Sequence, residues 1–79
     1  MKATIVSTTA VVEISDPQGR RCLARAWEGV TENGAHFVAY ITNVQVHKAE
    51  QHGEFERDLM DNKLPSPDAQ RAIDLRFVL

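Results

Sequence analysis

Three residues that the predicted sheet could bring to one face carry the groups needed for nucleophilic catalysis. Glu13, Cys22 and His47 supply a carboxylate, a thiol and an imidazole, which together can activate a cysteine. In the strand pairing derived below, Glu13 lies directly across from Cys22, and His47 lies diagonally beyond if the third strand extends that far. However, no oxyanion site or nucleophile elbow accompanies Cys22, and an open sheet excludes no water. We therefore interpret Cys22 as a small apolar filler and expect no enzymatic activity.

A metal site would have to combine Cys22 with His36, His47 and His52. These residues do not form the closely spaced pairs of common zinc sites, and His36 is expected to point away from Cys22. We interpret the histidines as surface residues and expect neither a metal nor another cofactor.

The only basic cluster consists of Arg20, Arg21 and Arg25, which Lys48 could join at the end of the sheet. One interpretation is a phosphate-binding patch of a small nucleic-acid-binding or regulatory module. The other, which we favour, is an ion pair between Arg25 and an overlying helix, because an unpaired charge beneath a helix is costly. The acids considered for this pair are Glu54, Asp58 and Asp61.

Acidic residues dominate the stretch from Glu50 to Asp61, which contains five acids and one base, Arg57. Such a stretch could imitate a track of phosphates and occupy a basic groove on a partner. Alternatively, it is the solvated face of a helix. The residues assigned to partner binding on the first interpretation are Glu54, Glu56, Asp58 and Asp61.

Two turn signals separate three runs of β-branched and aromatic residues. The runs predict strands over residues 4–15, 20–30 and 35–46. The sequence DPQG between the first two has the composition of a type I turn. Asn33-Gly34 predicts a type I′ hairpin between the second and third strands.

Two-residue loops at these turns place Trp27 opposite Tyr40 and Val12 opposite Leu23. One face is then the core face, and its members are Val6, Thr8, Ala10, Val12, Ile14, Leu23, Trp27, Val38, Tyr40, Val44 and Val46. The reverse face carries an apolar patch of Phe37, Ile41 and Val30. This patch indicates a partner interface, unless the last strand or a loop folds over it.

The second half of the chain predicts a short amphipathic helix from Gly53 to Lys63, whose apolar stripe of Phe55 and Leu59 covers the Trp27/Tyr40 face. Ser66 and Pro67 predict the start of a single helical turn. Alternation over residues 73–79 predicts a fourth strand. The expected fold is a single α+β domain over residues 1–79, with an antiparallel three- to four-stranded sheet in the order β-β-β-α-β and one short helix packed on one face.

The composition indicates the class of protein and the cellular compartment that suits it. The chain has 79 residues, of which 43% are hydrophobic and 25% charged, with a net charge of −2. A single core is marginal at this size, which favours a homodimer or a complex with a larger partner. The single cysteine fits a reducing compartment, and no signal peptide or membrane span is indicated. We expect a cytoplasmic protein that does not engage membranes.

Several segments together resemble small proteins carried by bacteriophages and prophages of Gram-negative bacteria, including inhibitors of the anti-CRISPR type. They are VSTTAVVEISDPQGR, ARAWEGVTENG, FVAYITNVQVHK and PSPDAQ through DLRFVL. The resemblance covers most of the chain but assigns no role to any residue. It implies a non-enzymatic inhibitor that sterically blocks a larger protein or ribonucleoprotein complex of the bacterial host. The alternatives are the nucleic-acid-binding module and a structural homodimer whose sheets join.

Overall fold

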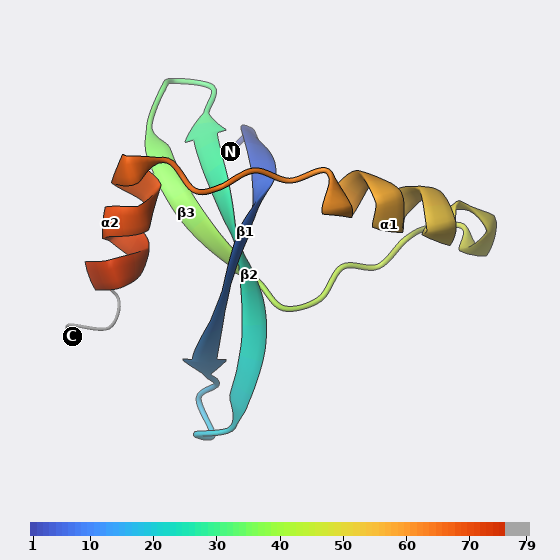
Figure 1. Cartoon of the computed structure of the whole chain (residues 1–79), viewed down its shortest axis with the longest axis horizontal. Coiled ribbons are helices and arrows are strands. Elements are labelled where there is room, and N and C mark those ends of the chain that lie inside the picture. The colour runs from blue at the N-terminus through green and yellow to red at the C-terminus, as the bar shows by residue number, and fades with distance from the viewer. Residues whose placement is uncertain (76–79) are drawn as a thin grey trace.

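The computed structural model describes residues 1–75 and has the expected α+β class (Figure 1). Its sheet is antiparallel, with three strands in the order β1-β2-β3. The strands are β1 (Ala3–Ser15), β2 (Arg21–Thr31) and β3 (His36–Ile41), and the helices are the 3₁₀ helix η1 (Ala49–Gln51), α1 (His52–Met60) and α2 (Pro67–Leu75).

Both turns of the sheet have three-residue loops. In the first, the Gly19 amide donates to the Asp16 carbonyl (2.9 Å) as in a type I turn, and the Asp16 amide donates to the Arg20 carbonyl (2.8 Å). In the second, the Gly34 amide donates to the Thr31 carbonyl (2.9 Å). Gly19 and Gly34 have φ values of 82° and 91°, the left-handed conformation that follows a type I turn in a three-residue hairpin loop. The type I prediction is confirmed, whereas the type I′ prediction is wrong.

The extra residue in each loop changes the pairing register by one. Trp27 pairs with Ala39 rather than with Tyr40, and Val12 pairs with Ala24 rather than with Leu23. Side chains alternate between the two faces of a strand. A shift of one residue therefore moves every side chain of β2 to the opposite face relative to the side chains of β1 and β3. Leu23 and Trp27 were expected in the core but lie on the reverse face, where Leu23 is 67% exposed.

The core lies between the other face of the sheet and α2. Val12, Ala26 and Ile73 are buried in its centre, with Tyr40 packed against them. Small residues fill much of this core, and the radius of gyration is 13.8 Å, against about 11.6 Å for a compact chain of this length. The two helices lie on opposite sides of the sheet and give the molecule an open outline (Figure 1).

The second half of the chain departs from several predictions. β3 ends at Ile41, so Val44 and Val46 lie in the connection to η1 rather than in the core. The predicted helix exists as α1, but none of its residues is buried. Ser66 caps α2 as expected, yet α2 continues to Leu75, where a fourth strand was predicted. The remainder of that predicted strand, residues 76–79, lies outside the described residues.

A bulge interrupts β1 between Ser7 and Val11 and joins the sheet to the second half of the chain. Thr8 is fully buried there, and its hydroxyl donates to the Ala26 carbonyl (2.7 Å), which takes the place of a backbone hydrogen bond. The next amide, that of Thr9, donates to the Lys63 carbonyl (2.9 Å). The bulge therefore fixes the connection between α1 and α2 to the edge of the sheet.

Replacing Thr8 tests the contribution of this bulge. The substitution Thr8→Val keeps the shape of the side chain but leaves the buried Ala26 carbonyl without its donor. We expect it to lower the free energy of unfolding by about 1–3 kcal/mol, measured by urea denaturation. The control Thr9→Val changes an exposed side chain and should have little effect. Equal stability of the two variants would contradict this role of Thr8.

Candidate functional site

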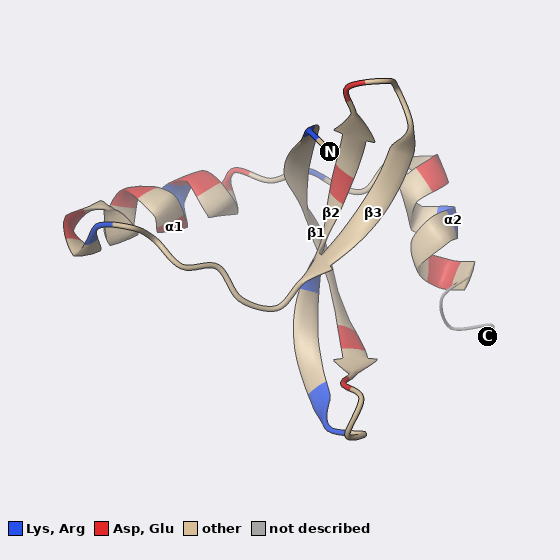
Figure 2. Cartoon of the chain, turned by 180° about the vertical axis from the view of Figure 1, so that it is seen from behind, with Lys and Arg blue, Asp and Glu red and all other residues tan. Residues whose placement is uncertain are grey.

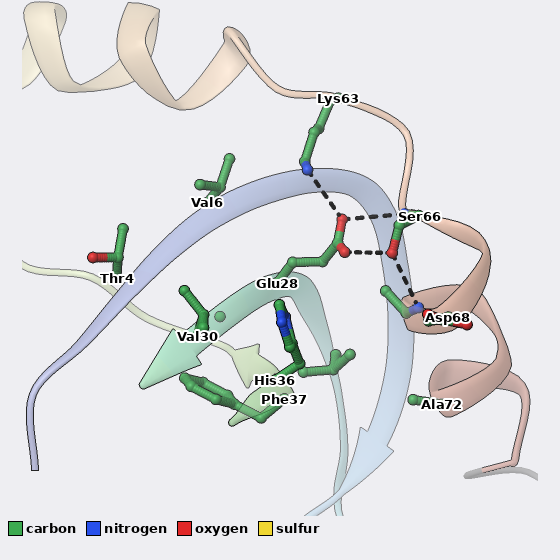
Figure 3. Close-up of a pocket in the computed structure, with 13 residues that line it drawn as sticks. Thr4, Val6, Glu28, Val30, His36, Phe37, Lys63, Ser66, Asp68 and Ala72 are labelled. Carbon is green, nitrogen blue, oxygen red and sulfur yellow. Dashed lines mark hydrogen bonds and ion pairs between the residues drawn. The ribbon is translucent and has the colours of Figure 1, made fainter. Parts of the chain in front are cut away.

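Glu28 is an acidic side chain of the sheet that lies at the N-terminus of α2, where it accepts two hydrogen bonds and forms an ion pair (Figure 3). The Ser66 hydroxyl donates to one carboxylate oxygen (2.6 Å), and the Ser66 amide donates to the other (3.1 Å). The Lys63 ammonium lies 3.4 Å from the second oxygen. The Ser66 hydroxyl also accepts a hydrogen bond from the Ala69 amide (3.2 Å), which caps α2. Glu28 thus anchors both the helix and its connection.

These contacts favour the charged form of Glu28. The hydrogen bond from the Ser66 hydroxyl lowers the pKa of this carboxyl from its ordinary 4.5, the Ser66 amide and Lys63 act in the same direction, and partial burial opposes them. Both carboxylate oxygens are occupied by these partners, so Glu28 serves as a fixed structural anion rather than as a general base.

An open hollow of about 580 Å³ lies beside Glu28, and we call it the α2 pocket. It is lined by apolar side chains of the sheet and by the first turns of α2, with Val6, Val30 and His36 among its residues (Figure 3). Val30 was expected on the reverse face, but its pairing with His36 puts it on the α2 side. The sequence does not predict Glu28 as a site residue, because only its partner Ser66 has a recognisable signal, that of a helix N-cap.

A second hollow of about 470 Å³ lies on the reverse face, between the sheet and α1, and we call it the α1 groove. Its apolar lining includes Val11, Leu23, Trp27 and Ile41 of the sheet and Phe55 and Leu59 of α1. The connection between β3 and η1 adds Val44 and Val46. Phe37 lies on the same face by its pairing with Gly29, which its ring covers, but it lines the α2 pocket rather than the α1 groove (Figure 3). Two of the three residues assigned to the apolar patch, Phe37 and Ile41, therefore do share a face. Trp27 joins them because of the register change.

The acidic residues assigned to partner binding are exposed along and just beyond α1 (Figure 2). Glu54, Glu56 and Asp58 lie within the helix, and Asp61 follows its last residue. His52 Nδ1 lies 3.4 Å from a carboxylate oxygen of Glu56. Both residues line the α1 groove, so the helix presents charge at the rim of an apolar surface.

The arginines make contacts within the sheet rather than with α1. Arg20 pairs with Asp16 (2.9 Å) and Arg21 with Glu13 (3.2 Å). The expected ion pair between Arg25 and a helix acid is wrong, because Arg25 Nη1 donates to the Thr8 carbonyl (2.8 Å) on the reverse face. Lys48 is the N-cap residue of η1 and does not belong to β2, which carries Arg21 and Arg25.

The residues first considered for catalysis do not assemble. Glu13 pairs with Leu23, whereas Cys22 pairs with Ile14, so the carboxylate and the thiol lie on opposite faces of the sheet. His47 lies beyond the end of β3. Within residues 1–75, no group of three His, Cys, Asp or Glu side chains has the arrangement needed to hold a metal ion.

The described residues form a small α+β protein in which a three-stranded meander carries one packed and one projecting helix, with the α2 pocket and the α1 groove beside them. No helix within the described part of the chain has the length and apolar character needed to cross a membrane. Comparison with protein-family models, curated proteins and solved structures found no match.

The Glu28 anchor predicts a specific pH dependence of stability. Because its pKa is lower in the folded state, its stabilising contribution is present above pH 4.5 and is lost as the pH falls through the folded-state pKa. We expect Glu28→Gln to lower the free energy of unfolding by about 1–3 kcal/mol at neutral pH and by much less in acid. Urea denaturation at several pH values measures this difference.

The control is Glu32→Gln, which alters an exposed carboxylate in the second turn. This variant should retain the pH dependence of the unmodified chain. A Glu28→Gln variant whose stability deficit stays constant from neutral to acidic pH would contradict the proposed anchor.

Proposed function

We propose that this chain is a non-enzymatic binding protein that blocks a larger protein or ribonucleoprotein complex by occupying its surface. On the resemblance to bacteriophage inhibitors of the anti-CRISPR type, the target is part of the host's own machinery or its antiviral defence. The expected site of action is the cytoplasm of the bacterial host cell.

The observation that carries this proposal is the position of α1. No residue of this helix is buried, and it projects from the sheet on the side opposite α2 (Figures 1 and 2). A short helix gains most of its stability from packing an apolar face, yet Phe55 and Leu59 remain only partly covered. Contact with a partner would complete this packing while bringing the acidic side chains against a basic surface.

The contacts of the arginines favour this function over nucleic-acid binding. Arg20 and Arg21 are engaged by Asp16 and Glu13, and Arg25 is turned towards a backbone carbonyl. A phosphate would have to compete with each of these partners. Binding of nucleic acid that weakened steeply with salt and depended on these arginines and Lys48 would overturn the inhibitor proposal.

Neutralising the acids of α1 tests the proposal. The immobilised chain is exposed to a lysate of a Gram-negative host, and retained complexes are identified by mass spectrometry and then purified. The variant Glu54→Gln/Glu56→Gln/Asp58→Asn/Asp61→Asn should bind the purified complex at least about tenfold more weakly, because close charge pairs across an interface contribute strongly to affinity. The unmodified chain should also inhibit the activity of that complex.

A matched pair of variants separates the position of the charges from their number. Glu54→Gln/Asp58→Asn removes two acids from α1, and Asp68→Asn/Asp74→Asn removes two from α2. Only the first should weaken binding. Equal affinity of the two variants, or retention of full affinity by the fourfold variant, would contradict a role for the acidic helix.

A further inference from the structure

The reverse face of the sheet is an apolar surface that the described chain leaves largely uncovered. Leu23 is 67% exposed, Val11 49% and Ile5 39%. Trp27 and Ile41 are half-buried beside them, and the partly covered Phe55 and Leu59 face them across the α1 groove. A contiguous apolar surface of this kind is typical of an interaction site rather than of a freely solvated face.

Local attachments keep α1 at the side of this surface. The C-terminal end of the helix is held at the bulge, where the Ser7 hydroxyl donates to the Leu59 carbonyl (3.4 Å) and the Thr9 amide to the Lys63 carbonyl (2.9 Å). Ser66 is held in turn by Glu28. To lie flat on the sheet, α1 would have to break these bonds, so the groove is built into the fold.

The other helix, α2, packs on the opposite face of the sheet and does not cover the groove. α2 buries Ala69 and Ile73 against Val12 and Ala26 on the opposite face. Within residues 1–75, no further helix or strand remains to fill the groove.

The charges around the groove indicate what could fill it. α1 forms one wall and carries Glu54, Glu56 and Asp58, with Arg57 as its only basic residue. Arg25, the basic residue of the floor, has its guanidinium bonded to the Thr8 carbonyl. Of these acids, Glu56 lines the groove, whereas Glu54 and Asp58 lie on the same helix outside the lining. The groove thus combines an apolar floor with one carboxylate, on a helix whose charges are mostly negative.

We propose that the α1 groove binds an amphipathic segment of a partner protein, with apolar side chains against Leu23 and Trp27 and lysine or arginine side chains along α1. A helix laid in an apolar groove is a common form of peptide recognition, and flanking basic residues would match Glu56 in the groove and the other acids exposed on α1. This inference rests on the proposed function and names the chemistry of the surface that the protein recognises.

A second copy of the chain fits this surface less well. In a two-fold contact each groove would receive the same surface of the other copy. Each copy would then present the same acidic helix, and any such contact that brought the two α1 helices together would be opposed by their like charges. A basic amphipathic segment meets no such repulsion.

The position of Trp27 provides a direct measurement, because it is the only tryptophan of the chain and lines the groove. The probe is a synthetic tryptophan-free helical peptide of leucine and lysine at amphipathic spacing. A peptide of leucine and glutamate with the same spacing is the control. The lysine peptide should change the Trp27 fluorescence saturably, and the glutamate peptide should not.

Leu23→Glu and Met60→Glu form a matched pair of variants. The two side chains are 67% and 68% exposed, each substitution adds one negative charge, and only Leu23 lines the groove. We expect Leu23→Glu to weaken binding of the lysine peptide at least about tenfold, and Met60→Glu to leave it within about twofold. Circular dichroism establishes that both variants are folded.

Four results would overturn the proposal. One is an equal fluorescence response to both peptides, and another is an equal effect of both variants. The third is a dimer of the unmodified chain, seen by sedimentation, that Leu23→Glu abolishes, because a second copy would then occupy the groove. If Leu23→Glu leaves binding to the purified host complex intact while neutralisation of α1 abolishes it, the groove proposal fails and the proposed function stands.

Discussion

The attachment of the connection between the helices to the bulge of β1 determines where both helices lie. Thr8 turns its hydroxyl inward to the Ala26 carbonyl, and Thr9 is left to bind the Lys63 carbonyl. From Lys63 the chain reaches Ser66, where Glu28 receives the N-terminus of α2. On its other side Lys63 follows α1, which is thereby held beside the reverse face (Figure 1). The bulge of β1 therefore lets α2 pack on one face of the sheet and keeps α1 at the side of the reverse face, which stays largely exposed.

The strands and turns could be predicted from the sequence, but the faces of the sheet could not. β-branched residues and the two glycine-containing turns were sufficient to place three antiparallel strands. Whether a loop has two or three residues depends on which residue adopts a positive φ, and the signal Asn33-Gly34 suits either geometry. Here only Gly34 does so in the second loop, and the first loop also has three residues. Together the two loops exchange Trp27 and Leu23 for alanines in the core.

The candidate functional surfaces were predicted to different extents for the same reason. The acids of α1 follow one another within a single amphipathic segment, so their exposure could be anticipated locally. Phe37 and Ile41 lie within one strand and kept their common face, whereas Val30 was separated from them by the register. Glu28 and Ser66 are 38 positions apart, and their contact depends on tertiary packing that no local pattern encodes.

The small residues of the core have a thermodynamic consequence. Ala24, Ala26 and Ala69 are buried where larger side chains usually lie, and Leu23 remains outside. Unfolding therefore exposes little new apolar area, and its heat-capacity change should fall below the usual figure of about 12–15 cal/mol/K per residue. Stability would then vary only gently with temperature. An occupant of the α1 groove would bury Leu23 and Trp27. A large part of the heat-capacity change that comes from burying apolar surface would then accompany binding rather than folding.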